Sequence, residues 1–565
     1  MSLYPLYPPP HHLRQVSGSR VDPGLEAETC HQPELPSQAY RLVIRTGSIR
    51  LHASDTAGFR HARLTLEQIR RHWPVLHELD IEDHPDLQRR GFMLDISRCR
   101  IPTLAQFEEL INLLASLKYN ELQLYMEHPF AYPGHELVWG ASSPLTPSEV
   151  RHLDGYCRSR GIELVPNQNS FGHMERWLKY PQYHYLAECP RGFRHPLDPT
   201  RGWVPGGSTL KPGRAALDFI ASLYEHLLPC FSSSLLHAGC DETWELGQGA
   251  SRDRIARLGK ERVYLDFVLG IQAIAARSGH RMMFWADMLQ DHPRYLSEIP
   301  ASCIPVLWGY EQSHPFHEYC PRIARAGLDF HVAPGTSDWD SYSGRLDNAL
   351  GNIRSAIQCG AQHRARGSLL VSWGDRGHQQ AWPLVLPGIV EAGCRSWNTG
   401  TGIDLETALA RSAFPSESSR LAEAVIRLGR IENGWIPEDR NHSFNRWLLR
   451  ANPLAVRMDL DLLDRKQLQA GLNEARALSE YVCNGYSPED RSLPAREIDL
   501  AARFCALAYQ RGLALLNGNS QQALCPEFQS LIGTFESLWL RRFRPGGLCE
   551  SSDHLRRALR SMLNN

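Results

Sequence analysis

The sequence has no run of about 18 apolar residues, the length that a membrane-spanning helix requires. It also has no surplus of one charge: 61 Lys and Arg face 62 Asp and Glu, which excludes the basic surface typical of nucleic-acid binding. Its 14 cysteines form no Cys-x-x-Cys pair and no zinc-type spacing with histidine, so we expect reduced thiols and no metal site. No apolar segment of a signal peptide opens the chain, and we expect a cytoplasmic protein.

The length of 565 residues is too great for one compact domain, so we expect one large domain with smaller units beside it. Residues 1–38 are rich in Pro, Ser, Gly and His without periodicity, which predicts a flexible Pro-rich extension. Residues 39–86 contain two alternating segments, Tyr40–Arg45 and Ile49–Ala53, and a helical pattern that opens at Leu64. This pattern predicts a small α/β subdomain away from the chemistry.

Residues 87–400 repeat an apolar strand, a polar tip and an amphipathic helix. This repeat predicts an α/β fold, the parallel (β/α)8 or TIM barrel. An open doubly wound sheet is the alternative, but it requires a glycine-rich phosphate loop after the first strand, which the sequence lacks. The candidate strands are Phe92–Ser97, Glu121–Met126, Glu163–Asn169, Ser234–Glu242, Arg281–Met288, Cys303–Glu311, Leu328–Thr336 and Ser368–Asp375.

Residues 401–565 have helical periodicity interrupted by prolines, which predicts an α-helical C-terminal region packed on the barrel. No motif in this region suggests a chemistry. It forms a wall of the pocket, the interface of a homodimer or a cap of the scaffold. The candidate helices are Leu405–Ala413, Ser418–Glu432, Leu454–Tyr481, Ala495–Leu516 and Pro526–Phe543.

The run Leu235–Trp244 is a short apolar strand that ends in two adjacent carboxylates, Asp241 and Glu242. Burying paired like charges is costly unless another group compensates them. The pair therefore indicates an active site, although two acids that cap the next helix would look the same.

The other predicted strands also end in polar and aromatic residues. The carboxyl ends of all eight strands meet at one face of a barrel, where the active sites of such enzymes lie. Aromatic faces pack on the C–H faces of a sugar ring, while carboxylates and amides bind its hydroxyls. The pattern therefore predicts a sugar site. Its members are Asp95 with Arg98, Glu127 with His128, Asn167 with Asn169, Trp285 with Asp287, Trp308 with Tyr310, Trp339 with Asp340, and Trp373 with Asp375.

Several motifs in the same order resemble glycoside hydrolase family 20, the β-N-acetylhexosaminidases. They cover roughly residues 40–400, and the Tyr-Pro-Gly-His-Glu run resembles the intracellular hexosaminidase D-like branch. The motifs are Arg89–Arg98 for the first strand, Lys118–Tyr125 for the second, Gly172-His173 after the third, His237-Ala-Gly-Cys-Asp241-Glu242 for the fourth, Trp373-Gly-Asp375 for the last, and Tyr132–Glu136.

Three segments depart from the family pattern. Cys99-Arg100-Ile101 replaces His-Phe-Phe after the first strand, and Glu127-His128 stands in place of an acidic stretch after the second. The region that supplies a tyrosine to the acetamido oxygen reads Ser337–Tyr342, so either Tyr342 or Tyr310 could take that role. These departures affect the exact substrate more than the reaction class.

The resemblance implies a role for each candidate residue. Glu242 is the general acid and base, Asp241 orients the acetamido group, and His173 with Glu127 positions Glu242. Arg90 matches the arginine that binds the C3 and C4 hydroxyls. The other substrate-binding candidates are Asn169, Trp285, Trp308, Tyr310, Trp339, Tyr342, Trp373 and Asp375.

Neighbouring residues of one extended strand point in opposite directions, so Asp241 and Glu242 are badly placed as the acid and nucleophile of a two-carboxylate glycosidase. The resemblance implies substrate-assisted catalysis instead, without a metal or organic cofactor. We therefore expect an exo-acting retaining enzyme that removes terminal β-linked GlcNAc or GalNAc from an oligosaccharide or glycoconjugate. The alternatives are a catalytically silent sugar-binding barrel, and a two-carboxylate glycosidase in which Glu127 or Asp375 is the nucleophile.

Overall fold

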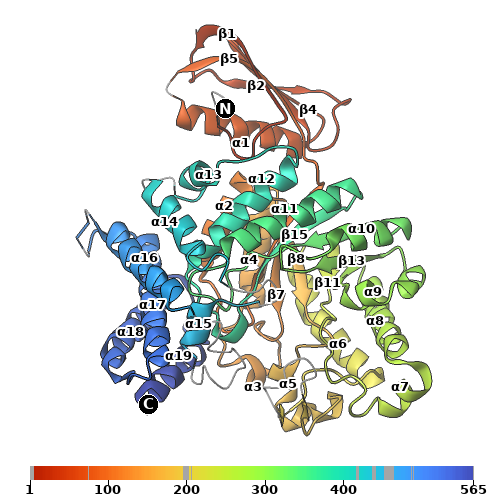
Figure 1. The fold of residues 1–565 in the computed structure, drawn as a ribbon. Helices are drawn as coiled ribbons and strands as arrows, with labels where there is room; N and C mark the ends of the chain where they lie inside the picture. The colour runs from red at the N-terminus through yellow and green to blue at the C-terminus, as the bar shows by residue number, and fades with distance from the viewer. Residues whose placement is uncertain are drawn as a thin grey trace.

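A computed structural model describes residues 5–563, except positions 74, 195–202, 205, 415–418, 436–440, 451–463, 485 and 488. Its centre is a closed barrel of eight parallel strands in the order β11-β12-β13-β14-β15-β6-β7-β8 (Figure 1). All eight predicted strands are present, so the predicted (β/α)8 barrel is confirmed. The strands are β6 (Arg89–Asp95), β7 (Glu121–Met126), β8 (Glu163–Gln168), β11 (Leu235–His237), β12 (Arg281–Trp285), β13 (Cys303–Trp308), β14 (His331–Ala333) and β15 (Gly367–Ser372).

Helices that follow the strands cover the outside of the barrel, and their apolar faces join one large core with the outer faces of the strands. Aromatic and aliphatic residues fill the inside of the barrel in a second cluster. The long barrel helices are α2 (Leu104–Ser116), α4 (Pro147–Ser159), α6 (Arg214–Leu227), α8 (Lys260–Arg277), α10 (Phe316–Arg325), α11 (Leu346–Gln362) and α12 (Leu386–Trp397). Short elements lie in the loops: α3 (Glu136–Trp139), α5 (Glu175–Leu178), α7 (Arg252–Leu258), α9 (Asp287–Asp291), β9 (Phe193–Arg194) and β10 (Trp203–Val204).

The N-terminal sheet lies at the end of the barrel opposite α3 and α5 (Figure 1). Its strand order is β1-β5-β3-β4-β2, and α1 packs on it. The flexible extension expected for residues 1–38 is wrong, because β1 and β2 are edge strands of this sheet. Both are mostly polar and are held by main-chain pairing, so they leave no hydrophobic period. The elements are β1 (His12–Val21), β2 (Ala27–His31), β3 (Tyr40–Arg45), β4 (Ser48–Ala53), α1 (Thr56–His72) and β5 (Leu76–Asp83).

Helix α1 begins at Thr56, eight residues before the predicted start at Leu64. Asp55 caps it by accepting a hydrogen bond from the Gly58 amide, at 2.7 Å. A Cβ on Gly58 would lie 2.3 Å from the carbonyl oxygen of Ala39, so glycine allows the helix to approach the sheet.

The C-terminal region consists of helices that pack along one side of the barrel (Figure 1). Residues 454–463 of one predicted helix lie outside the described residues. No helix in the described part of the chain is long and apolar enough to cross a bilayer. The C-terminal helices are α13 (Leu405–Ser412), α14 (Ser419–Gly429), α15 (Phe444–Leu448), α16 (Arg465–Cys483), α17 (Leu493–Leu516), α18 (Cys525–Arg542) and α19 (Leu548–Leu563).

Candidate active site

The two adjacent acids lie on a loop, which we call the acid loop (Ala238–Glu242), and not on the strand predicted to extend to Glu242. Strand β11 ends at His237, and three of the loop residues have left-handed backbones: φ is 68° at Gly239, 76° at Cys240 and 50° at Glu242. This turn changes the direction of the side chains. The Nε2 atom of His173 lies 3.3 Å from Asp241 Oδ2 and 3.3 Å from Glu242 Oε2. The expectation that the two carboxylates point in opposite directions is therefore wrong.

Neighbouring elements hold the acid loop in this strained conformation. Asn169 accepts a hydrogen bond from the Cys240 amide and donates one to Asp241 Oδ1, each at 3.2 Å. Tyr264 of α8 donates to the Cys240 carbonyl at 2.7 Å. A Cβ on Gly239 would lie 2.3 Å from the Asn169 side chain. Glycine and the three braces together fix the position of the acids.

Gly172 explains why glycine precedes His173. A Cβ at this position would lie 2.2 Å from the carbonyl oxygen of Asp241, so only glycine lets the two loops approach so closely. The close approach brings the His173 imidazole to the carboxylates of the acid loop.

The electrostatic environment gives His173 and Asp241 opposite charges. Burial alone would lower the pKa of His173, but Asp241 and Glu242 raise it well above its usual 6.5. Burial likewise raises the pKa of Asp241, but the charge of His173 and a hydrogen bond from it lower that pKa below its usual 3.8. At neutral pH the site therefore contains an imidazolium beside an ionised Asp241.

A second polar group surrounds Arg98, three residues after the carboxyl end of β6. Its guanidinium lies 2.9 Å from Asp95 Oδ2, 3.7 Å from Glu127 Oε1 and 3.5 Å from Asp375 Oδ1. It also covers the rings of Tyr125 and Trp373, with its central carbon 5.2 and 4.9 Å from their centroids. The strand-tip pattern placed Arg98 with Asp95 in the predicted sugar site, but the sequence assigned Arg98 no individual role.

The aromatic residues at the strand ends come together inside this face of the barrel. The rings of Trp308 and Tyr310 stack at 5.3 Å, and Tyr310 meets Trp339 edge-on at 5.2 Å. The ring centroid of Trp373 lies 5.9 Å from that of Trp285. Trp285 and Trp339 are each 1% exposed and Trp373 6%, whereas Trp308 is half-buried. Trp308 and Tyr310 are thus the members of this group that are open to a ligand.

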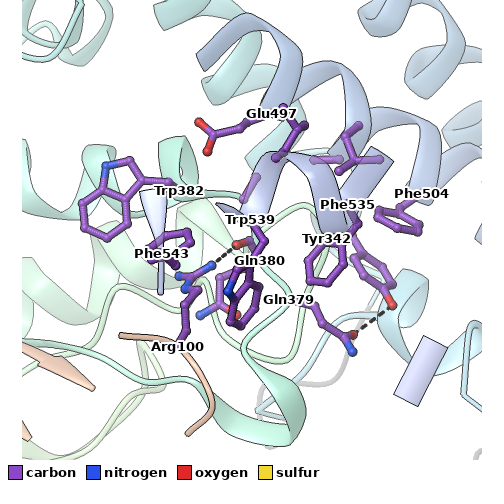
Figure 2. A pocket seen from close by; sticks show the side chains of 14 residues that line it. Arg100, Tyr342, Gln379, Gln380, Trp382, Glu497, Phe504, Phe535, Trp539 and Phe543 are labelled. Carbon is purple, nitrogen blue, oxygen red and sulfur yellow. Dashed lines mark hydrogen bonds between the residues drawn. The ribbon is translucent and has the colours of Figure 1, made fainter. Parts of the chain in front are cut away.

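Tyr342 lies away from the acids, so the site role expected for it is wrong. Figure 2 shows it in a small cavity that α17 and α18 help to line. Its ring stacks on Phe504 at 4.8 Å, and its hydroxyl donates to Gln379 Oε1 at 3.2 Å. Of the two candidate tyrosines, Tyr310 is the one whose pKa the charges of Asp241 and Glu242 help to raise.

Arg90 is at the opposite end of the barrel, so the expectation that it binds sugar hydroxyls is wrong. It is fully buried at the start of β6, where its guanidinium donates to the carbonyls of Lys118, Leu87 and Gln88. It also donates to Gln38 Oε1 of the N-terminal domain at 2.9 Å. Arg90 therefore joins the two domains.

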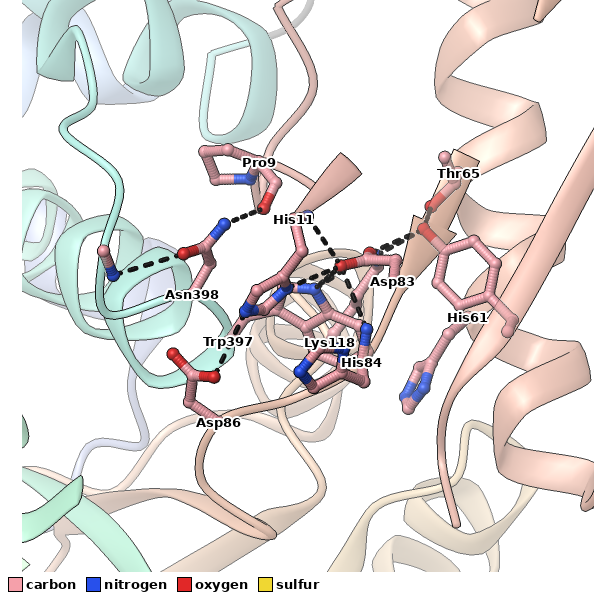
Figure 3. A network of polar contacts seen from close by, with 12 residues as sticks. Pro9, His11, His61, Thr65, Asp83, His84, Asp86, Lys118, Trp397 and Asn398 are labelled. Atoms are coloured by element: carbon pink, nitrogen blue, oxygen red, sulfur yellow. Dashed lines mark hydrogen bonds and ion pairs between the residues drawn. The ribbon is translucent and has the colours of Figure 1, made fainter. Parts of the chain in front are cut away.

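One group of candidate metal ligands occurs among the described residues: His11, His84 and Asp86, at the same domain junction (Figure 3). Both ring nitrogens of His11 are hydrogen bonded to carboxylates, at 3.1 Å from Asp83 and 3.1 Å from Asp86. These bonds raise the pKa of His11 to about 9. A protonated imidazole has no free lone pair for a metal, so these contacts describe a hydrogen-bond network.

Glu127 lies between the two polar groups of the site. It accepts a hydrogen bond from Tyr125 at 3.1 Å and is paired with Arg98. Burial raises its pKa to about 7, although Arg98 and His173 lower it. Among the described residues Glu127 forms no hydrogen bond or ion pair with His173, whose Nε2 atom faces the acid loop.

A cavity of about 380 Å³ lies within the size range of small-ligand pockets. Asp287, Trp308 and Tyr310 line it, whereas no residue of the acid loop is among its lining residues. Burial, followed by the charges of Asp241 and Glu242, raises the pKa of Asp287 to about 8. Asp287 stood beside Trp285 in the strand-tip pattern, but sequence reasoning did not give it a role.

The catalytic-domain model of glycosyl hydrolase family 20 matches residues 88–337. The resemblance to family 20 is confirmed. The chain is 27% identical to hexosaminidase D of Bos taurus over 38% of its own length and 61% of that protein. Human hexosaminidase D is 26% identical over 38% of the chain and 44% of that relative. The chain thus matches less than two thirds of the length of either relative.

Solved family 20 structures have the same fold. The Vibrio harveyi exo-β-N-acetylglucosaminidase, solved with N-acetylglucosamine, gives a TM-score of 0.58 at 16% identity, covering 75% of this chain and 78% of that one. The Flavobacterium johnsoniae chitobiase gives 0.60 at 14% identity, covering 95% and 98%. At such identities the likeness shows the fold alone.

Proposed function

We propose that the protein is an exo-acting β-N-acetylhexosaminidase that removes terminal β-linked GlcNAc or GalNAc and retains the anomeric configuration. The observation that carries this proposal is the convergence of Asp241 and Glu242 on one nitrogen of His173. Two carboxylates on the same side of a site cannot act as the opposed acid and nucleophile of a two-carboxylate glycosidase. They suit a reaction in which the substrate supplies the nucleophile.

The two acids differ in the exposed fraction of their side chains, and this difference assigns them different roles. The side chain of Glu242 is 32% exposed, whereas that of Asp241 is 10% exposed. The more accessible Glu242 reaches the glycosidic oxygen and transfers a proton to it. The buried and ionised Asp241 holds the acetamido N–H and stabilises the positive charge that develops there.

The reaction has two steps. The acetamido carbonyl oxygen attacks the anomeric carbon, the bond to the leaving oxygen breaks, and Glu242 donates its proton to that oxygen. The product of this step is an oxazolinium ion, whose charge Asp241 balances. Glu242, now a carboxylate, removes a proton from water as the water oxygen attacks the anomeric carbon and reopens the ring. Two inversions at this carbon give overall retention.

Tyr310 and Trp308 complete the proposed binding site. The Tyr310 hydroxyl lies within the field of both acids and is the candidate donor to the acetamido oxygen. The half-buried Trp308 offers its ring face to the sugar, while Arg98, Asp375 and Asn169 present polar groups around it. Asp375 and Glu127 are both held by Arg98, which weakens them as nucleophiles.

Aryl β-glycosides of GlcNAc, GalNAc, glucose and galactose test the proposal directly. We expect turnover of the two N-acetylated sugars and tight competitive inhibition by a thiazoline that mimics the oxazoline intermediate. A fluorinated glycoside that trapped an ester on Glu127 or Asp375 would instead identify a two-carboxylate enzyme. Thiazoline binding without turnover of any glycoside would identify a silent sugar-binding barrel.

A further inference from the structure

Asn441 belongs to the C-terminal region, but it lines the cavity of about 380 Å³ at the carboxyl end of the barrel. Trp308, the last residue of β13, lines the same cavity together with Tyr310 and Glu311 of the loop that follows. The family 20 match ends at residue 337, so it assigns no role to Asn441. The C-terminal region thus supplies part of the lining of a cavity that the barrel forms.

Two hydrogen bonds fix the orientation of the Asn441 amide. Its Oδ1 atom accepts from Trp339 Nε1 at 3.1 Å and from Arg345 Nη2 at 3.0 Å. Indole and guanidinium nitrogens are donors only, so the amide oxygen must face them. The Nδ2 atom forms no hydrogen bond with the described residues, and Asn441 is exposed. Asn441 therefore offers an N–H donor to an acceptor in the cavity.

The two partners of Asn441 are held in place themselves. Arg345 donates to both carboxylate oxygens of Glu311, at 2.9 and 3.0 Å. Trp339 is almost fully buried, and its ring meets that of Tyr310 edge-on. An amide held between two such groups loses little conformational freedom when a ligand binds, which favours affinity.

The chain that follows this asparagine is anchored on the loop after β14. The Ser443 amide donates to the Asp340 carbonyl at 3.3 Å. Asn445 accepts from the Tyr342 amide at 3.0 Å and donates to Ser343 Oγ at 2.8 Å. Main-chain and side-chain contacts therefore fix the position of this segment relative to the barrel.

Two other residues that line the cavity have an unpaired polar atom. Trp308 Nε1 and Asp287 Oδ1 are buried and form no hydrogen bond with the described residues. Buried polar atoms are nearly always hydrogen bonded, so an unpaired donor and an unpaired acceptor at one cavity indicate a ligand with both kinds of group. Sugar hydroxyls fit this requirement, because each of them both donates and accepts.

We propose that Asn441 is a substrate-binding residue whose Nδ2 atom donates a hydrogen bond to an oxygen of the terminal N-acetylhexosamine. This inference rests on the proposed function, which places that sugar against Trp308 and Tyr310. It gives the C-terminal region a direct contact with the substrate, in addition to its packing along one side of the barrel.

Asn441→Asp separates the contact with the ligand from the contacts with the protein. It keeps an acceptor oxygen for Trp339 and Arg345 and removes only the N–H donor, so the melting temperature should not fall. Loss of one hydrogen bond should raise the Kd of the oxazoline-mimicking thiazoline and the KM of an aryl β-GlcNAc glycoside by roughly 3- to 12-fold. We expect a much smaller change in kcat, because the contact lies away from the acid loop.

Two further variants control for the added charge and for the lost donor. Asn473→Asp makes the same chemical change in the same region: Asn473 is exposed on α16, its Oδ1 atom accepts from Gln469 Nε2 at 3.0 Å, and it does not line the cavity. Its KM and thiazoline affinity should equal those of wild type. Asn441→Ala adds no charge and removes the donor and the acceptor, so it should weaken thiazoline binding at least as much as Asn441→Asp and also lower the melting temperature.

Calorimetric titration with the thiazoline and steady-state kinetics with the aryl glycoside give distinct outcomes. Unchanged thiazoline affinity in Asn441→Asp, or an equal loss in Asn473→Asp, would overturn the binding role while the proposed function stands. A higher KM with unchanged thiazoline affinity would place the contact on the leaving group and contradict its assignment to the terminal sugar. If wild type bound the thiazoline but cleaved no glycoside, the hydrolase function would fail, and the affinities would still decide the role of Asn441. If wild type neither bound nor cleaved, both proposals would fail.

Discussion

An arginine packs against a tryptophan near each end of strand β6, but the two arginines have opposite surroundings. Arg90 lies with its central carbon 5.1 Å from the Trp397 ring centroid and donates to main-chain carbonyls and a side-chain amide. Arg98 lies 4.9 Å from the Trp373 ring centroid and contacts three carboxylates. Burial and the neighbouring Arg89 lower the pKa of Arg90 to about 9, whereas Asp95 and other acids outweigh burial and raise the pKa of Arg98.

The different surroundings indicate different roles: Arg90 holds two domains together, whereas Arg98 belongs to the candidate binding face. At the amino end every guanidinium nitrogen of Arg90 donates a hydrogen bond, and the side chain is fully buried. At the carboxyl end Arg98 and Asp375 are 21% and 37% exposed, so hydroxyl groups of a ligand can reach them. An arginine at the start of β6 thus stabilises the fold, whereas an arginine three residues beyond its end lies at the face where we propose that the ligand binds.

The largest expected effect concerns the carboxyl end. Glu242→Gln should lower kcat/KM by about 10²- to 10⁴-fold for a substrate whose leaving group needs a proton. The loss in the first step should be far smaller for a strongly acidic phenol, which leaves without protonation. Steady-state and burst kinetics with a series of aryl glycosides measure this, and equal losses across the series would remove Glu242 from the acid role.

Matched substitutions of the two arginines test the comparison itself. Arg98→Met should lower kcat/KM by roughly 100-fold while most of the stability remains, because it removes the group that orders three carboxylates of the site. Arg90→Met should lower the free energy of unfolding by about 1–3 kcal/mol, because it leaves buried carbonyls without donors, and kcat/KM of the folded enzyme should change little. Denaturant unfolding and kinetics on both variants check this; the reverse pattern would place the binding arginine at the amino end.

A second matched pair compares two tryptophans of the carboxyl end. Trp285 is 1% exposed, so Trp285→Ala should cost about 3–5 kcal/mol of stability. Trp308 is half-buried and open to the cavity, so Trp308→Ala should raise KM several-fold at a smaller cost in stability. Melting temperatures and KM values of the two variants check this prediction. Equal losses of stability and equal increases of KM in Trp285→Ala and Trp308→Ala would contradict it.

The smallest effect concerns the amino end. Hydrogen bonds to Asp83 and Asp86 raise the pKa of His11 from 6.5 to about 9. A raised histidine pKa stabilises the folded state fully below about pH 6.5, and that contribution is lost as pH rises through about 9. His11→Gln should therefore be less stable than wild type at pH 6, and the difference should shrink at pH 9. Unfolding curves at the two pH values measure this, and a difference independent of pH would contradict the assigned charge.

The barrel could be predicted because its strands are buried on both faces and therefore appear as apolar runs with polar ends. The edge strands β1 and β2 could not, because main-chain pairing holds them and their side chains are mostly exposed. The start of α1 could not be predicted, because glycine is a common turn residue, whereas Gly58 lies in the first turn of the helix and allows close packing against Ala39.

The convergence of side chains could be predicted for residues at the end of a strand or in the loop that follows it, as for Trp308, Tyr310, Asp241 and Glu242. It was not predictable where the position along a strand decides the role: the seven residues of β6 separate its two ends by roughly 20 Å, so Arg90 and Arg98 cannot share a site. Tyr342 and Asp287 depend on how loops fold against other elements, and no spacing in the sequence reports that.

The most direct test of substrate-assisted catalysis uses aryl β-glycosides whose acetamido group carries zero to three fluorines. Fluorine withdraws electrons from the carbonyl oxygen and weakens it as a nucleophile, while the contacts of the sugar ring stay the same. If that oxygen attacks the anomeric carbon beside Asp241 and Glu242, log kcat/KM should fall steadily with each fluorine. Rates that did not depend on fluorination would show that the nucleophile belongs to the protein.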